Sequence, residues 1–289
     1  MLPVAAYLLA AGYDEWIDAA YIAQADVLMA AGVYWSANLF VTWGRSPWWS
    51  LLTLLLPAML TSIHRMVLDG PFAALVAAFL LTWERGQRLR CAALAGLAMG
   101  MRETGALLVI ALAVDALFRR QWRQLTGSAV MAFPAAAWIL MHYRPIQSGQ
   151  GIGILGWPLI GHASRLLESW PDGAGWRLTT AEAAQRIALA GLLVAVALAA
   201  QYLVNNRWRA PEWALAGFCL LALGLASPAH LRESFGFARP VTPLLVILAW
   251  TGIRDSAPMR AAACFVPSLP ILMTFGSDAL RMAAALFRA

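Results

Sequence analysis

Arg102 and Glu103 are adjacent charged residues between two uncharged apolar stretches, residues 92–101 and 105–114. A charged side chain inside an apolar membrane segment is costly, and it marks a functional site by default. A guanidinium group binds phosphate through charge-assisted hydrogen bonds, so Arg102 is a candidate for holding an anionic group. The alternative is a structural ion pair between Arg102 and Glu103.

Two more arginines are expected on the same side of the membrane as Arg102. Arg65 follows His64 at the end of an apolar segment, and Arg239 precedes Pro240 at the start of another. Three cations at one level, with His64 beside them, favour a pocket for phosphate or for a lipid phosphate. His64 and Arg65 can equally be a helix end whose charged groups reach the lipid headgroups.

Four carboxylates are candidates for acid–base chemistry. Asp14 and Glu15 belong to an acidic turn near the start of the chain, Glu103 lies in the motif above, and Asp69 precedes Gly70–Pro71. Adjacent carboxylates can supply a general base or ligands for a divalent cation, whereas a solvated acidic loop is the alternative. Asp69 is also positioned to N-cap the helix that Gly70–Pro71 opens.

The composition indicates an integral membrane protein. Of the 289 residues, 61% are hydrophobic and only 12% are charged, about half the charged fraction of a soluble domain. Apolar segments recur along almost the whole chain, which predicts an all-α, polytopic helical bundle with about nine to ten hydrophobic segments. No soluble domain is visible, so residues 1–289 form a single transmembrane domain. The expected location is the inner membrane of a bacterium.

The basic residues and the cysteines exclude two other classes of function. The net charge of +6 comes from arginine alone, and in a membrane protein it reflects cytoplasmic loops and not nucleic-acid binding. The three cysteines stand alone in apolar segments, so neither a disulfide nor a metal site is expected from Cys91, Cys219 and Cys264.

Short turns rich in arginine predict the orientation of the bundle. Five turns alternate with the other loops so that all five can face the cytoplasm, as the positive-inside bias favours. Together they hold Arg45, Arg85, Arg88, Arg90, Arg119, Arg120, Arg123, Arg207, Arg209, Arg254 and Arg260. Because two of these turns flank residues 91–118, that segment is predicted to be a hairpin that reverses at Arg102–Glu103. Each arm then measures only about 18 to 22 Å, which places the charged tip below the outer surface of a core about 30 Å thick.

The start of the chain and one long polar stretch complete the expected organisation. Residues 1–11 are apolar but too short to span the membrane, so the chain is expected to begin partway through a larger fold. Residues 144–182 are predicted to form an outer loop. Thr179 and Glu182 have the capping-box spacing that predicts the start of the next helix.

Several short motifs resemble those of bacterial multi-spanning glycosyltransferases of the GT-C superfamily. They cover about residues 45–250 and comprise Ser46-Pro47-Trp48-Trp49, Arg65 with Asp69-Gly70-Pro71, Trp83-Glu84-Arg85-Gly86, Arg102-Glu103-Thr104-Gly105 ahead of an apolar run and Arg119-Arg120, and Phe235-Gly236-Phe237-Ala238-Arg239 before Pro243-Leu244-Leu245. The resemblance implies transfer of a sugar from a polyprenyl-phosphate donor on the extracytoplasmic side. The implied partners are membrane lipid and the polyprenyl-phosphate-linked sugar, and a catalytic acidic residue is implied in the first outer loop.

The start of the chain departs from this family pattern, which begins with a full span and a long acidic loop. Asp14 and Glu15 could replace that loop, although they lie where a later outer turn is expected. The N-terminal helices and the catalytic loop are therefore expected to be missing, with the lipid-phosphate pocket retained. Two other functions stay open: a carrier of a lipid or anionic solute, which internal repeats would favour but none is visible, and a non-catalytic membrane scaffold.

Overall fold

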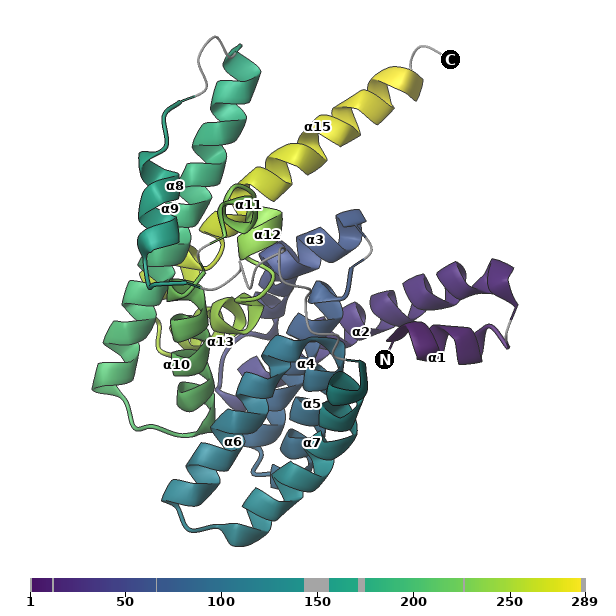
Figure 1. The fold of residues 1–289 in the computed structure, drawn as a ribbon, viewed down its shortest axis with the longest axis vertical. Helices are drawn as coiled ribbons and strands as arrows, with labels where there is room; N and C mark the ends of the chain where they lie inside the picture. Colours follow the sequence, from purple (N-terminus) through teal and green to yellow (C-terminus); the bar gives the residue numbers. More distant parts are fainter. Residues whose placement is uncertain are drawn as a thin grey trace.

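The computed structural model describes residues 2–11, 13–65, 67–142, 156–170, 175–225 and 227–286. In this part of the chain, helices account for nearly all of the structure and no strand occurs (Figure 1). The α-helices are α1 (Leu2–Leu9), α2 (Asp14–Thr42), α3 (Pro57–Arg65), α4 (Asp69–Glu84), α5 (Arg88–Met101), α6 (Ala106–Phe118), α7 (Trp122–His142), α8 (Ile160–Leu167), α9 (Trp176–Asn205), α10 (Ala210–Leu223), α11 (Pro228–Leu231), α12 (Ser234–Phe237), α13 (Thr242–Arg254), α14 (Pro258–Ala263) and α15 (Leu269–Leu286). Three 3-10 helices, η1 (Pro47–Leu55), η2 (Glu103–Gly105) and η3 (Val266–Ser268), connect some of them.

Among the described residues, three stretches of helix are long and apolar enough to cross a membrane: Trp122–Met141, Leu178–Asn205 and Pro258–Arg281. The all-α prediction is confirmed, whereas several other segments expected to span are short helices. The helices α5, α6 and α13 have 14, 13 and 13 residues, which is about 20 Å each. They are short because charged turns or prolines end them.

Helix α4 occupies the centre of the bundle and packs against α2, α3, α5 and α13. Every residue from Asp69 to Leu81 is buried. Small side chains let the neighbours approach closely: a Cβ added at Gly32 of α2 would lie 2.7 Å from the Cβ of Ala74. The prediction that Asp69-Gly70-Pro71 opens a helix ending near Trp83 is therefore confirmed by the bounds of α4.

The predicted hairpin at Arg102–Glu103 is confirmed. Helix α5 ends at Met101, Arg102 has an extended backbone (φ −145°, ψ 138°), and η2 leads into α6, which packs back against α5. The turn is tight because Gly105 lies against the backbone of the preceding helix: a Cβ at Gly105 would be 2.5 Å from the carbonyl carbon of Ala98.

Substitution Gly105→Ala is expected to destabilise the hairpin by about 1–3 kcal/mol, the usual cost of forcing a methyl group into a packed site. The neighbour is backbone, so it cannot rotate away. The matched control is Gly276→Ala in α15, where an added Cβ meets no atom within 4 Å. Thermal unfolding of the detergent-solubilised variants measures both, and equal melting temperatures for the two would contradict the close approach at Gly105.

The arginine-rich turns gather at one end of the bundle. The Arg45 Nε donates a hydrogen bond to the Arg254 carbonyl (3.1 Å), and Arg254 lies 4.0 Å from Glu84. The turns that join α6 to α7 and α9 to α10 lie at the lower end in Figure 1. This arrangement agrees with the prediction that these turns share one side of the membrane, and the assignment of that side to the cytoplasm stays a prediction.

The predicted loop over residues 144–182 is partly wrong. Helix α8 lies inside it, and α9 begins at Trp176, before the predicted capping box. Glu182 lies in the second turn of α9, and its carboxylate accepts hydrogen bonds from Arg165 and Arg186, both at 2.6 Å. A pair with Arg165, 17 residues away, and a pair with Arg186, one turn along α9, take the place of the predicted cap. Residues 143–155 and 171–174 lie outside the described residues.

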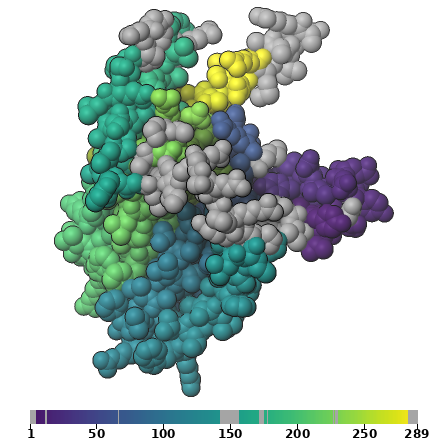
Figure 2. All heavy atoms as spheres, in the orientation of Figure 1, coloured from purple at the N-terminus to yellow at the C-terminus, as the bar shows by residue number. Residues whose placement is uncertain are grey.

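Two segments project from the body of the molecule. Helix α1 and the adjoining half of α2 form an arm on one side, and the last helix, α15, extends in another direction (Figure 2). The acidic turn that contains Asp14 and Glu15 is the first turn of α2, so both carboxylates belong to the arm, and both are exposed.

Candidate functional site

A buried carboxylate holds two arginines together at the end of the bundle opposite the arginine-rich turns. Asp69, at the first position of α4, has a side chain that is 1% exposed. Its Oδ1 accepts a hydrogen bond from Nη1 of Arg102, and its Oδ2 accepts one from Nε of Arg239 at 2.6 Å. Three residues that are far apart in the sequence therefore meet at one point.

The prediction that Asp69 N-caps α4 is wrong. The N-cap residue is Leu68, and it makes no side-chain cap bond. Both carboxylate oxygens of Asp69 are used by guanidinium groups. The hydroxyl of Ser62 takes over part of the capping, since it accepts a hydrogen bond from the N–H of Gly70 (2.6 Å) and donates one to the carbonyl of Val67 (2.6 Å).

A pocket of about 470 Å³ opens beside these arginines. Its wall includes Arg65, Arg102 and Arg239 together with the carboxylates of Glu103 and Glu233. The Arg65 guanidinium stacks over the ring of Phe235, with its carbon 4.0 Å from the ring centroid. One side of the pocket is therefore cationic and aromatic, and carboxylates lie on the same lining.

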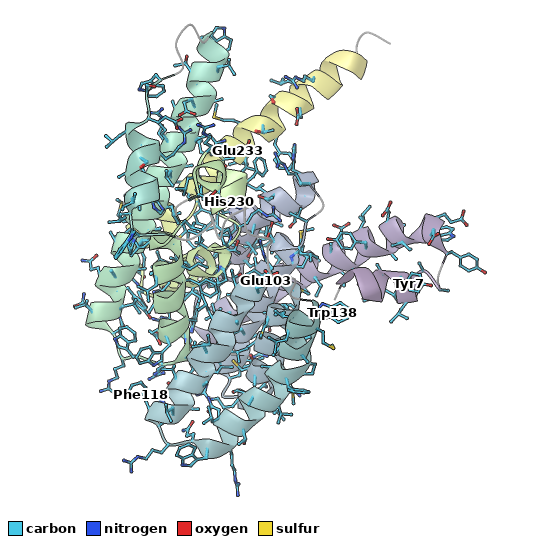
Figure 3. All side chains as sticks on the ribbon, in the orientation of Figure 1. Tyr7, Glu103, Phe118, Trp138, His230 and Glu233 are labelled. Atoms are coloured by element: carbon cyan, nitrogen blue, oxygen red, sulfur yellow. The ribbon has the colours of Figure 1, made fainter. Side chains whose placement is uncertain are left out.

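Arg102 pairs with Asp69 and not with Glu103, so the predicted ion pair within the hairpin tip is replaced by a longer-range one. The side chain of Glu103 is exposed and faces the pocket. Figure 3 shows Glu103 near the centre of the molecule, with His230 and Glu233 above it.

Two helices begin beside lining residues of the pocket. Helix α6 starts two residues after Thr104, and α13 starts two residues after Pro240. The N-terminal end of each helix carries partial positive charge from its unpaired N–H groups. These dipoles add to the guanidinium charge and favour an anion in the pocket.

A network of ion pairs anchors the segment that carries His230 and Glu233. Arg232 donates to Glu168 after α8 (2.8 Å), and Arg165 donates to the same carboxylate (2.8 Å) and to Glu182 on α9 (2.6 Å). The hydrogen bond from Arg232 holds the pKa of the Glu168 carboxyl below its usual range. The pocket wall formed by α11 and α12 is thus fastened to α8 and α9.

The remaining predicted site residues lie elsewhere. His64 does not line the pocket: its Nε2 lies 3.2 Å from the carboxylate of Asp278 on α15, and its ring packs against Phe275. Asp14 and Glu15 lie on the α1–α2 arm, away from the pocket (Figure 1). The structure therefore brings together Arg65, Asp69, Arg102, Glu103 and Arg239 and leaves out the acidic turn.

Sequence reasoning missed His230 and Glu233 as pocket residues. In the sequence these two residues belong to a short polar stretch before Phe235, and such a stretch is typical of any loop at a membrane interface. His230 Nδ1 lies 3.2 Å from the hydroxyl of Ser227, which fixes the ring near the pocket. Among the described residues, no group of three or more His, Cys, Asp or Glu side chains could hold a metal ion.

Comparisons with known proteins add no relative: no family model, no curated protein and no solved structure matches the chain.

Proposed function

We propose that this chain is a polytopic membrane protein of the GT-C glycosyltransferase type, which binds a polyprenyl-phosphate-linked sugar in the pocket beside Asp69. The observation that carries the proposal is the fixed pair of guanidinium groups on one buried carboxylate. A single carboxylate neutralises one positive charge, so Arg102, Arg239 and Asp69 together keep one positive charge. Counted with Arg65, Glu103 and Glu233 the site is formally neutral, so its cationic character is local to the paired guanidinium groups. The short motifs around Arg65, Arg102 and Arg239 that resemble the GT-C superfamily support the same reading.

The hydrogen-bonding capacity of the wall suits a phosphate. Each guanidinium has five N–H donors, and Asp69 uses only some of them. The side chains of Arg102 and Arg239 are 21% and 39% exposed, which leaves donors facing the cavity. Because Asp69 holds both arginines in place, little side-chain entropy is lost when an anion binds.

The size and depth of the pocket suit a phosphosugar that is carried by a lipid. A cavity of about 470 Å³ falls within the usual range for small-molecule sites. It lies at the tip of a hairpin whose arms are only about 20 Å long, so in a bilayer it is reached from the hydrocarbon core and from the aqueous side. An isoprenoid chain can remain in lipid while the phosphate reaches the arginines.

In the proposed transfer step, a carboxylate acts as the base and arginines stabilise the leaving phosphate. A carboxylate on the pocket wall, Glu103 or Glu233, takes the proton of an acceptor hydroxyl. The oxygen then forms a bond to the anomeric carbon, and the bond from that carbon to the phosphate oxygen breaks, with its electron pair leaving on the phosphate. Arg102 and Arg239 stabilise this charge. Asp69 touches neither reactant and acts as a positioning residue.

Binding of a polyprenyl-phosphate hexose to the protein in nanodiscs tests the proposal. Arg65→Gln removes a cation from the pocket without touching Asp69, so the fold is retained. Loss of one charge-assisted hydrogen bond of about 1.5–3 kcal/mol predicts an affinity about 10- to 100-fold lower. Arg102→Gln is expected to weaken binding at least as much.

The matched control is Arg281→Gln, which removes an exposed arginine of α15 that does not line the pocket and takes no part in the ion pairs that fasten its wall. Its affinity for the donor should equal that of the wild type. Undiminished binding by the Arg65 and Arg102 variants would overturn the proposed site.

A further inference from the structure

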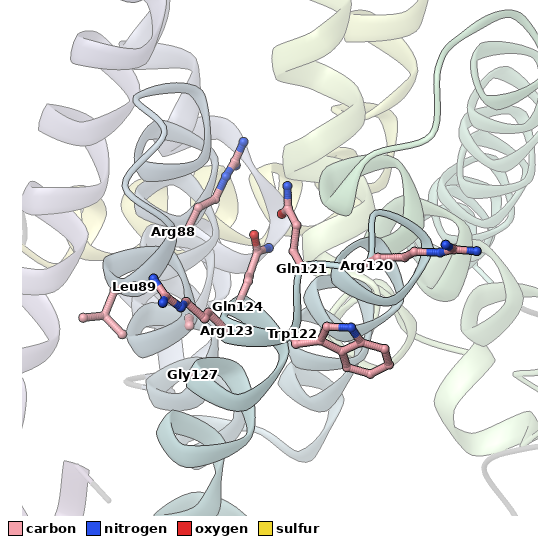
Figure 4. Close-up of a pocket in the computed structure, with 9 residues that line it drawn as sticks. Arg88, Leu89, Arg120, Gln121, Trp122, Arg123, Gln124 and Gly127 are labelled. Carbon is pink, nitrogen blue, oxygen red and sulfur yellow. The ribbon is translucent and has the colours of Figure 1, made fainter.

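A second pocket, of about 720 Å³, lies at the opposite, arginine-rich end of the bundle, where α5 and α7 begin side by side. Figure 4 shows Arg123 next to Leu89 on one side, Trp122 and Arg120 on the other, and Gln124 between them. The pocket has no part in the site around Asp69. We propose that it binds the headgroup of an anionic phospholipid.

The charge of the pocket is positive and unopposed within the described residues that line it. Arg88, Arg120 and Arg123 line the cavity from different sides, and no carboxylate lines it (Figure 4). The Asp115 carboxylate interacts electrostatically with Arg88 but is already paired with Arg119, whose Nε lies 2.9 Å from Asp115 Oδ1. An anion entering the pocket therefore meets cations that no acidic side chain of the lining neutralises.

Two side chains of the pocket, Arg88 and Gln124, can donate hydrogen bonds to a ligand. Arg88 is held in place, because its guanidinium carbon lies 3.5 Å from the ring centroid of Trp83 and its Nη1 donates to the Trp83 carbonyl (3.2 Å). The amide nitrogen of Gln124 is buried and has no hydrogen-bond partner among the described residues. A phosphate oxygen in the pocket would satisfy this donor. The first turns of α5 and α7 add the positive ends of two helix dipoles.

The apolar surroundings indicate a lipid and not a free anion. Leu89 and Trp122, both 62% exposed, border the pocket. On α7, Phe133 and Leu140 follow Trp122 at separations of 11 and 18 residues, about three and five helical turns, so the three side chains point the same way. Phe133 and Leu140 are 70% and 76% exposed. Acyl chains can lie along this face of α7 while the phosphate occupies the pocket, as basic pockets between membrane helices bind lipid headgroups.

Native mass spectrometry of the full-length protein in detergent tests the inference, with phosphatidylglycerol, phosphatidylcholine and inorganic phosphate as probes. The wild type should retain phosphatidylglycerol in preference to phosphatidylcholine. The double variant Arg120→Gln/Arg123→Gln, whose two residues are exposed, should bind phosphatidylglycerol about tenfold more weakly. Leu89→Glu places a carboxylate at the border of the pocket and should reduce binding further.

The matched control is Arg85→Gln/Arg90→Gln, which removes the same charge from exposed positions at the same end, outside the pocket. An equal loss in the control variant would mean that surface charge alone attracts lipid, and would overturn the site. Equal retention of phosphatidylcholine would overturn the headgroup assignment, and inorganic phosphate that displaces the lipid at equal concentration would overturn the lipid assignment. Failure of donor binding at the Asp69 site leaves these outcomes unchanged.

Discussion

Asp69→Asn is expected to destabilise the protein by about 3 kcal/mol, since removing one partner of a buried ion pair leaves an uncompensated charge. The shape of the side chain is nearly conserved, but the change is severe. One acceptor oxygen becomes an NH2 donor that faces a guanidinium donor, and two arginines lose the carboxylate with which they are paired. Thermal unfolding in detergent measures the loss, and donor binding should fall as well because Arg102 and Arg239 are no longer held.

The control for Asp69 is Asp278→Asn, which breaks the pair with His64 on a carboxylate that is 38% exposed. A partly exposed pair contributes about 0–1 kcal/mol, so this variant should unfold close to the wild-type temperature. If Asp69→Asn were equally mild, the arginines would not depend on the buried carboxylate, and the reading of Asp69 as a positioning residue would be wrong.

Glu103→Gln is expected to lower the rate of sugar transfer by about 10²–10⁴, the usual contribution of a general base. Donor affinity should not fall, because the substitution removes a negative charge from the pocket wall. Glu103 is exposed, lines the pocket and pairs with neither Arg102 nor Arg239. Its substitution therefore removes a proton acceptor without disturbing the ion pairs. Release of polyprenyl phosphate from the lipid-linked sugar, followed by mass spectrometry, reports the rate whichever acceptor is used.

Two variants decide the assignment of the base. Glu84→Gln, at the arginine-rich end and 4.0 Å from Arg254, should transfer sugar at the wild-type rate. Glu233→Gln tests the other carboxylate of the pocket. A large loss in Glu233→Gln with a normal rate in Glu103→Gln would move the role to Glu233. Transfer at the wild-type rate by both variants would contradict a carboxylate base in this pocket.

The sequence was sufficient to predict features that depend on neighbouring segments of the chain. Arg102 and Glu103 lie between two short apolar runs, and an arginine-rich turn flanks each run. If both turns lie on one side of the membrane, the chain must reverse at Arg102–Glu103, and α5 and α6 form that hairpin. The same reasoning about sides placed Arg65, Arg102 and Arg239 at one level, and the structure joins them around one pocket, with Asp69 bound to two of them.

The sequence was insufficient where tertiary contacts override local patterns. Asp69 has the pattern of an N-cap and Glu182 that of a capping box, yet arginines from distant segments bind both carboxylates. Local rules cannot show such partners, which lie 170 and 17 residues away. His230 and Glu233 join the pocket on a segment that an ion pair fastens to the end of α8 and that a hydrogen bond from the Ser234 N–H to Gln185 fastens to α9.

The short helices around Asp69 have a mechanical consequence for a surrounding bilayer. Helices of about 20 Å cannot match a hydrocarbon core of about 30 Å without strain. The membrane would yield by thinning beside α5, α6 and α13, at a modest cost for each ångström of mismatch. Such a dimple would lower the lipid headgroup plane toward the arginines, so that a lipid phosphate would travel a shorter distance into apolar surroundings to meet them.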